Sequence, residues 1–171
     1  NKMRILFLDV DGVLNGYNKW TYLWINIFQF LHIPVRISSK ILNIFEVKEK
    51  YVKRLHKIIK STDAKVVMSS SWRGGYWKTP YDKMWKDQKK LYDLLHKYNI
   101  EIIDITPNLS GKREDEINQW LKDTDLNVES FVILDDESFD LQSFVGKQLV
   151  KTSEVVNGDM IRGLSYEDTG L

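Results

Sequence analysis

The stretch Ile5-Leu6-Phe7-Leu8-Asp9-Val10-Asp11-Gly12 is the strongest indication of the fold. Four apolar residues end abruptly in two acidic residues and a glycine. An uncharged run of this length is typical of a strand that is buried on both faces of a sheet. We therefore expect the two acidic side chains at the carboxyl end of a central strand.

Similar short apolar runs recur along the chain and alternate with segments of helical periodicity. The spacing of apolar residues predicts helices over 47–60 and 82–98. Acidic residues after 110 predict another helix, with Ser110 or a neighbour as its N-cap. This alternation indicates a parallel, three-layer, Rossmann-like α/β sheet with right-handed crossovers. The further expected strands are Lys65–Met68, Ile100–Ile103, Phe131–Leu134 and a short one at Gln148–Val150.

The composition limits the classes of function. A chain of 171 residues suffices for one core, so we expect a single domain over 1–171. The net charge of +1 gives no global attraction to nucleic acid or an anionic membrane, so any such attraction must come from a local patch. The absence of cysteine excludes disulfides, thiolate nucleophiles and cysteine-based metal sites. Carboxylates remain as the main candidate ligands, and they favour a hard cation such as Mg²⁺.

Residues 16–44 interrupt the alternation of strands and helices with a crowd of aromatic side chains. The apolar stretch 20–31 is only about half of the roughly 20 residues that a membrane span needs, so we expect no membrane partner. The first residues lack the uncharged core and small-residue cleavage site of a secretory signal, and the expected location is the cytoplasm. The aromatic residues in question are Tyr17, Trp20, Tyr22, Trp24, Phe28 and Phe30.

The acidic strand ends carry the expected chemistry. Asp9 and Asp11 follow one buried strand, and Asp135 and Asp136 follow another. In a parallel sheet both pairs lie at the same edge, where neighbouring carboxylates repel unless a proton or a cation relieves them. Because Mg²⁺ combines one or two carboxylates with phosphate oxygens, the pattern predicts a phosphate substrate. The alternative for 9–12 alone is an ordinary turn, since aspartate and glycine favour turns.

The sequence contains, in order, Leu6-Phe7-Leu8-Asp9-Val10-Asp11-Gly12-Val13, Val66-Val67-Met68-Ser69, a basic residue at Lys112 or Arg113, and Ile133-Leu134-Asp135-Asp136. These four ordered motifs resemble those of the haloacid dehalogenase-like (HAD) phosphohydrolase superfamily. The resemblance spans residues 4 to about 140. More narrowly, the same segments are similar to a small HAD group that is found fused to RNA repair enzymes. The motifs are Asp-Val-Asp-Gly-Val-Leu-Asn at 9–15, Ser-Ser-Ser-Trp-Arg at 69–73, Arg-Glu-Asp-Glu-Ile at 113–117 and Val-Ile-Leu-Asp-Asp at 132–136.

The resemblance implies an aspartyl-phosphate mechanism with Mg²⁺. Asp9 is expected to attack phosphorus, and Asp11 to act as general acid and then general base. Ser69 is expected to bind a phosphoryl oxygen, while Arg113, or Lys112 in another register, neutralises its charge. The Mg²⁺ ligands implied by the resemblance are the Asp9 carboxylate, the Asp11 backbone carbonyl, and Asp135 supported by Asp136.

Several assignments have alternatives. Ser70 or Ser71 replaces Ser69 if the strand register shifts by one residue. Asp140 competes with Asp136, because the superfamily often carries a further acid after its last motif. Arg73 either binds a second phosphate or the substrate backbone, or it forms a structural ion pair.

The resemblance also implies a small cap over the site at about 16–44. Its aromatic residues either stack on a base and exclude water, or pack against the core or a partner subunit. The leading expectation is a phosphatase acting on a phosphomonoester, with a nucleotide or an RNA or DNA end as substrate. The alternatives are a small-metabolite phosphatase and a non-enzymatic HAD-fold binding module, and the oligomeric state stays open.

Overall fold

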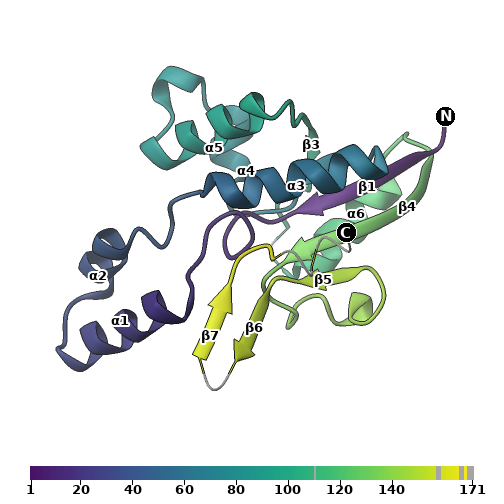
Figure 1. Cartoon of the computed structure of the whole chain (residues 1–171). Coiled ribbons are helices and arrows are strands. Elements are labelled where there is room, and N and C mark those ends of the chain that lie inside the picture. The colour runs from purple at the N-terminus through teal and green to yellow at the C-terminus, as the bar shows by residue number, and fades with distance from the viewer. Residues whose placement is uncertain (110, 157–158, 166–167, 169–171) are drawn as a thin grey trace.

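The computed structural model describes residues 1–109, 111–156, 159–165 and 168. Its centre is a sheet of five strands in the order β3-β2-β1-β4-β5, each parallel to its neighbours (Figure 1). The expected parallel, Rossmann-like α/β class is thereby confirmed. The strands are β1 (Met3–Leu8), β2 (Lys65–Met68), β3 (Ile102–Ile105), β4 (Val128–Asp135) and β5 (Leu149–Lys151).

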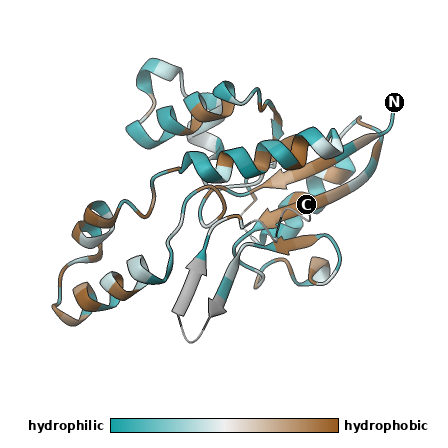
Figure 2. Ribbon diagram, viewed as in Figure 1, coloured by the Kyte–Doolittle hydropathy of each residue, from teal (hydrophilic) through white to brown (hydrophobic). Residues whose placement is uncertain are grey.

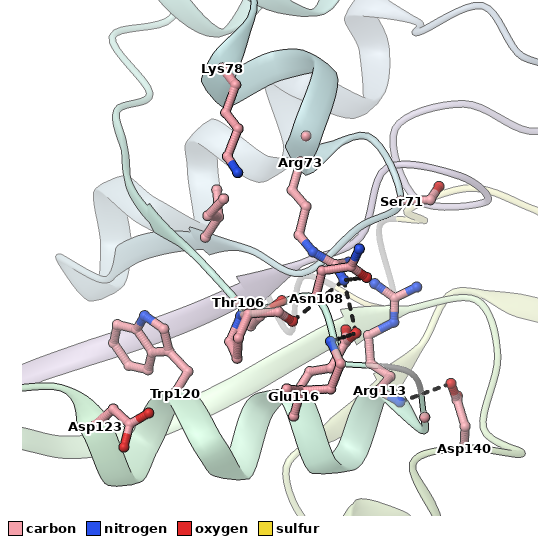
Figure 3. A pocket seen from close by; sticks show the side chains of 15 residues that line it. Ser71, Arg73, Lys78, Thr106, Asn108, Arg113, Glu116, Trp120, Asp123 and Asp140 are labelled. Carbon is pink, nitrogen blue, oxygen red and sulfur yellow. Dashed lines mark hydrogen bonds and ion pairs between the residues drawn. The ribbon is translucent and has the colours of Figure 1, made fainter.

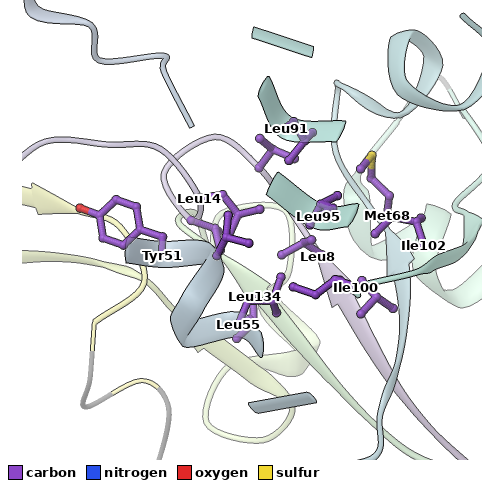
Figure 4. Close-up of a cluster of buried hydrophobic side chains, with 14 of the residues drawn as sticks. Leu8, Leu14, Tyr51, Leu55, Met68, Leu91, Leu95, Ile100, Ile102 and Leu134 are labelled. Carbon is purple, nitrogen blue, oxygen red and sulfur yellow. The ribbon is translucent and has the colours of Figure 1, made fainter. Parts of the chain in front are cut away.

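Helices cover both faces of this sheet and give it three layers. Along β1, Ile5 and Phe7 pack on one face with residues of α6 (Arg113–Asp123). Leu6 and Leu8 join the opposite core, which includes residues of α3 (Glu49–Thr62) and α5 (Lys86–Lys97) (Figure 4). This alternation explains why β1 reads as a continuous apolar run, since both of its faces are buried.

Several element boundaries differ from the sequence expectation: the helix expected over 47–60 spans Glu49–Thr62, and the strand expected over 131–134 spans Val128–Asp135. Two further differences have local reasons. The expected helix over 82–98 begins only at Lys86, because the Trp85 amide donates to the Gln88 side chain at 3.1 Å and so defines the first turn. The third strand begins at Ile102 rather than at 100, because the Ile100 amide still closes the preceding helix by donating to Leu95 O at 2.9 Å. Before α5 lie a short helix, α4 (Arg73–Lys78), and a 3₁₀ turn, η1 (Tyr81–Lys83).

The chain after β4 contains elements that the sequence did not predict. A 3₁₀ turn, η2 (Gln142–Phe144), precedes β5, and an antiparallel pair, β6 (Ser153–Val156) with β7 (Asp159–Arg162), follows it. The Arg162 amide donates to Tyr17 O at 3.0 Å and ties β7 to the segment after β1. The expected N-cap Ser110 lies outside the described residues. The residue at the N-cap position of α6 is Lys112, whose side chain makes no capping hydrogen bond.

Most of the aromatic segment forms two short helices, α1 (Lys19–Phe30) and α2 (Val35–Leu42), which we call the arm. The arm contacts β7 and projects away from the sheet (Figure 1). Among the helices that the structure describes, none is long and apolar enough to cross a membrane.

The strand order reverses direction next to β1. From β1 the chain proceeds outward to β2 and β3 on one side, and then returns to β4 and β5 on the other. In open parallel sheets, ligands bind beyond the carboxyl ends of the strands at such a reversal. The topology therefore predicts a ligand site at the ends of β1 and β4, where the acidic residues lie.

Candidate active site

Three buried carboxylates meet where β1 and β4 end. Asp9, Asp135 and Asp136, which we call the acid triad, bring ligand oxygens within 4.8 Å of one another. The two strands hold this arrangement directly, since the Asp9 amide donates to Leu134 O at 3.0 Å. Parallel pairing thus brings together acids that lie far apart in the sequence.

Burial makes the acid triad electrostatically costly. It raises the pKa of Asp9 to about 6, although the Arg113 charge works in the opposite direction. Burial, followed by the charge of Asp9, raises the pKa of Asp135 to about 8. Burial also raises the pKa of Asp136. Three carboxylates in this setting require protons or a cation to balance their charge.

The loop after β1 approaches the acid triad too closely for any side chain at position 12. Gly12 has a φ of 70°, a conformation that favours glycine. A Cβ atom there would overlap the Asp136 carboxyl group. The glycine of the Asp-Val-Asp-Gly motif is therefore required for the close approach of the loop to Asp136, in addition to its general preference for turns.

Asp11 lies beside the acid triad and is held by two hydrogen bonds. Asn15 Nδ2 donates to one carboxylate oxygen at 2.8 Å, and Trp72 Nε1 donates to the other at 2.9 Å. Sequence reasoning assigned no role to either donor. The sequence marks these two residues only by placing them inside two of the motifs. Nothing in it indicates that the Trp72 indole contacts Asp11.

The hydroxyl groups after β2 lie at the same edge. The Ser69 amide donates to Leu8 O at 2.8 Å, and its Oγ is buried without a partner among the described residues. A hydrogen bond from Ser70 lowers the pKa of Asp9 against the effect of burial. Ser71 is exposed and lines the space in front of the acids. All three candidate serines are therefore near the site, with different surroundings.

Of the two candidate basic residues, Arg113 reaches the acid triad. Its Nε lies 3.7 Å from Asp135 Oδ2, and its guanidinium also donates to Ser69 O. Lys112 is exposed one residue before α6 and does not line the space around the acids. The competing acid Asp140 lies outside the triad, where it accepts a hydrogen bond from the Arg113 amide at 3.2 Å.

Arg73 is committed to a buried network. Its guanidinium pairs with Glu116 at 2.8 Å and donates to Asn108 Oδ1 at 3.0 Å (Figure 3). It also donates to Ser70 O at 2.8 Å, so it connects the serine segment to α6. Of the two roles expected for Arg73, the structural ion pair is present, and phosphate binding stays a prediction.

Arg162 is a further basic residue that the sequence did not indicate. Its Nε lies 3.3 Å from Asp136 Oδ2, and its Nη2 donates to Glu137 Oε1 at 2.9 Å. Its guanidinium also lies 5.8 Å from the centre of the Tyr17 ring, in cation–π contact. Arg162 thus links the acid triad to the segment that precedes the arm.

Three spaces adjoin one another around these residues. The acid hollow, of about 230 Å³, contains the acid triad, Asp11, Arg113 and Arg162 in its lining. The aromatic pocket, of about 370 Å³, shares Asp11 and Ser71 with it. The large cavity, of about 670 Å³, shares Ser71, Arg113 and Asp140 with the acid hollow (Figure 3). The full lining of the aromatic pocket is Asp11, Phe45, Ser71, Trp72, Trp85, Asp87 and Gln88.

A parallel α/β sheet with acids after β1 and β4, serines after β2 and an arginine opening α6 defines a HAD-like domain. Comparison with known families agrees: the chain belongs to the family described as the HAD domain in Swiss Army Knife RNA repair proteins, which matches residues 5–167. This match covers all five strands of the parallel sheet from Ile5 onward and all three members of the acid triad. A comparison with curated proteins found no match.

Proposed function

We propose that this protein is a Mg²⁺-dependent phosphatase that hydrolyses a phosphomonoester through an aspartyl-phosphate on Asp9. The observation that carries the proposal is the acid triad, whose buried oxygens converge within 4.8 Å at the reversal of strand order. Membership of the HAD family supports the same class of reaction.

The acid triad fits a hard divalent cation by its chemistry. Carboxylate oxygens are the ligands that Mg²⁺ prefers. Burial raises the pKa values of Asp9 and Asp135, so their charged forms are disfavoured in spite of Arg113 and would be stabilised by a bound cation. Asp9, Asp135 and Asp136 would hold the ion. Bound Mg²⁺ would neutralise the carboxylates and the phosphoryl oxygens, and so allow an anionic substrate to approach.

The first chemical step uses Asp9 as the nucleophile. Its carboxylate oxygen forms a bond to phosphorus while the ester P–O bond breaks, which gives an acyl phosphate and an alkoxide leaving group. The Arg113 guanidinium lines the acid hollow and is available to bind the phosphoryl oxygens. The resemblance assigns the same role to Ser69, whose buried hydroxyl has no partner among the described residues. Hydrogen-bond donors of this kind contribute most to the rate when their positions are fixed before the reaction begins. The hydrogen bond from Arg113 to Ser69 O fixes the position of the guanidinium.

Asp11 serves as general acid and then as general base. In its protonated form it gives a proton to the departing alkoxide. As a carboxylate it then takes a proton from the water that attacks phosphorus, which breaks the bond to Asp9 and releases phosphate. The hydrogen bonds from Asn15 and Trp72 orient the carboxyl group for both transfers.

The aromatic pocket supports a nucleotide or a nucleic acid end as substrate. Because Asp11 protonates the leaving group, that group must lie beside Asp11, where the aromatic pocket meets the acid hollow. The walls include Phe45, Trp72 and Trp85, which suit the face of a nucleobase better than a sugar phosphate or another small polar metabolite.

A phosphate-release assay tests the proposal. The substrates are 3′- and 5′-mononucleotides, 3′- and 5′-phosphorylated oligonucleotides and sugar phosphates, each with Mg²⁺ and with EDTA. We expect Mg²⁺-dependent release that favours nucleotides or oligonucleotides. Faster turnover of sugar phosphates would indicate a small-metabolite phosphatase. No turnover of any of these substrates or of an aryl phosphate would indicate a non-enzymatic binding module.

A further inference from the structure

Helix α2 buries polar residues and exposes apolar ones, which is the reverse of the usual burial pattern of a surface helix. Its two buried residues are Ser38 and Ser39, whose hydroxyls donate to the backbone carbonyls of Val35 and Arg36. Val35, Ile37 and Ile41 are at least half exposed. A surface helix normally buries its apolar residues and exposes its polar ones. The outward face of α2 is therefore suited to contact with an apolar phase.

Helix α1 also exposes apolar side chains. None of its residues is buried. Trp20, Leu23, Ile27 and Phe30 recur at spacings of three and four, which aligns them along one side of the helix. Trp20 is 64% exposed and Phe30 is 81% exposed. Apolar residues colour much of both arm helices (Figure 2), and a concentration of exposed apolar side chains is typical of an interaction site.

The charges of the arm are of one sign. The sequence from Gly12 to Phe45 contains no aspartate or glutamate. Arg36 and Lys40 are exposed and lie one turn apart on α2, so they border the row formed by Ile37 and Ile41. The arm thus combines exposed apolar side chains with positively charged side chains and no acidic ones. It is complementary to a surface whose outer layer is anionic and whose interior is apolar.

We propose that the arm lies on the surface of an anionic lipid bilayer. These helices are too short to span a bilayer. A helix that lies in the bilayer interface does not need that length, but it needs an apolar face bordered by lysine and arginine. This proposal replaces the expectation of no membrane partner, which rested on span length and on the absence of a large net charge, and it supplies the local patch that such an attraction requires. The inference is independent of the catalytic proposal, because it uses no residue of the acid triad.

Other occupants fit less well. A second copy of the chain would bring arms of like charge together. Single-stranded RNA would match the cations and the tryptophans, but the aliphatic side chains of Leu23, Leu31 and Ile41 do not stack on bases. A bilayer interface accommodates the aliphatic residues, the tryptophans and the cations together.

Flotation of the full chain with lipid vesicles tests the proposal. We expect binding to phosphatidylglycerol–phosphatidylcholine vesicles, little binding to pure phosphatidylcholine, and weakening in 0.5 M NaCl. The Arg36→Gln/Lys40→Gln variant should bind at least ~10-fold more weakly, because each cation near an anionic surface contributes to the affinity. Ile37→Ser/Ile41→Ser should also lose binding. The matched control, Lys122→Gln/Lys147→Gln, removes two exposed charges elsewhere and should bind as the wild type does.

Three results would overturn the proposal. One is the absence of wild-type binding to anionic vesicles, and another is equal weakening by the control variant. The third is a concentration-dependent dimer or an RNA complex that is lost in the Ile37→Ser/Ile41→Ser variant while vesicle binding persists. Circular dichroism melts establish that each variant is folded, and the wild-type comparison of lipids and salt decides the matter even if a variant is not.

Discussion

The acid triad and the arm break the usual rule of burial in opposite ways. The triad buries carboxylates that water would solvate well, and the arm exposes tryptophan and isoleucine side chains that a core would accommodate. Both arrangements cost free energy in the isolated chain. In each region the proposed partner would lower this cost: a cation at the acid triad, and an apolar, anionic surface at the arm.

The largest effect is expected from removing the nucleophile. Asp9→Asn should lower phosphatase kcat by ~10⁴-fold or more, because an amide cannot form the acyl phosphate. Steady-state phosphate release measures the loss. The matched control is Asp63→Asn, on an exposed residue whose left-handed conformation asparagine tolerates, and it should retain full activity. Turnover by Asp9→Asn near the wild-type rate would refute the assignment of the nucleophile.

Removal of the acid and base should have the next largest effect. Asp11→Asn should lower kcat by about 10²- to 10⁴-fold, because neither proton transfer is then assisted. The loss should be smaller for an aryl phosphate, whose leaving group needs little protonation, as long as the first step limits the rate. Comparison of kcat for an aryl and an alkyl phosphate tests this. Equal losses for both would argue against the acid role.

The acid triad should make stability depend on pH in the absence of metal. The pKa values of Asp9 and Asp135 are raised in the folded protein, so the folded state holds protons that the unfolded state has released. The contribution of these two acids is therefore greatest below about pH 4 and is lost as the pH rises to about 8. In EDTA, the free energy of unfolding should fall between pH 5.5 and 8 by on the order of 1–3 kcal/mol more than in Asp135→Asn.

Mg²⁺ should reverse this trend. Because the ion binds the deprotonated carboxylates, the rise in Tm that it produces should be larger at pH 8 than at pH 5.5. Thermal melts with Mg²⁺ and with EDTA at both pH values measure the difference. A Tm at pH 8 that is the same with Mg²⁺ as with EDTA would contradict a cation site at the acid triad.

A smaller effect is expected from the indole that holds Asp11. Trp72→Phe keeps an aromatic wall in the aromatic pocket but removes the donor to Asp11. We expect kcat to fall by about 10-fold for an alkyl phosphate and less for an aryl phosphate, with KM nearly unchanged. Loss of affinity alone would assign Trp72 to substrate binding instead of to the positioning of Asp11.

The smallest effect should come from the arm. Trp24→Ser and Ile41→Ser should each change the free energy of unfolding by less than about 0.5 kcal/mol, because both side chains are already about half exposed or more. Leu8→Ala, in the core, should cost about 2–5 kcal/mol. Urea denaturation measures all three variants. A large loss of stability at Ile41 would mean that the arm is part of the folded core.

The sequence predicted the parts of the site that depend on strands. Apolar runs that end in acids defined β1 and β4, and parallel pairing then brought Asp9 and Asp135 to one edge. The sequence did not predict the contacts of Trp72 and Arg162, and it offered an ion pair for Arg73 without its partner Glu116. Each of these contacts depends on how helices and loops pack in three dimensions. The sequence also did not predict the inverted burial of α2, because apolar periodicity ordinarily predicts a buried apolar side and α2 departs from that rule.

The pairing of β1 with β4 has a consequence for biosynthesis. More than one hundred residues separate Asp9 from Asp135, and β2, β3 and their helices are made between them. A nascent chain therefore carries one half of the site long before the other half leaves the ribosome. Such long-range contacts slow folding, and they also ensure that the acid triad is assembled only after β4 has paired with β1.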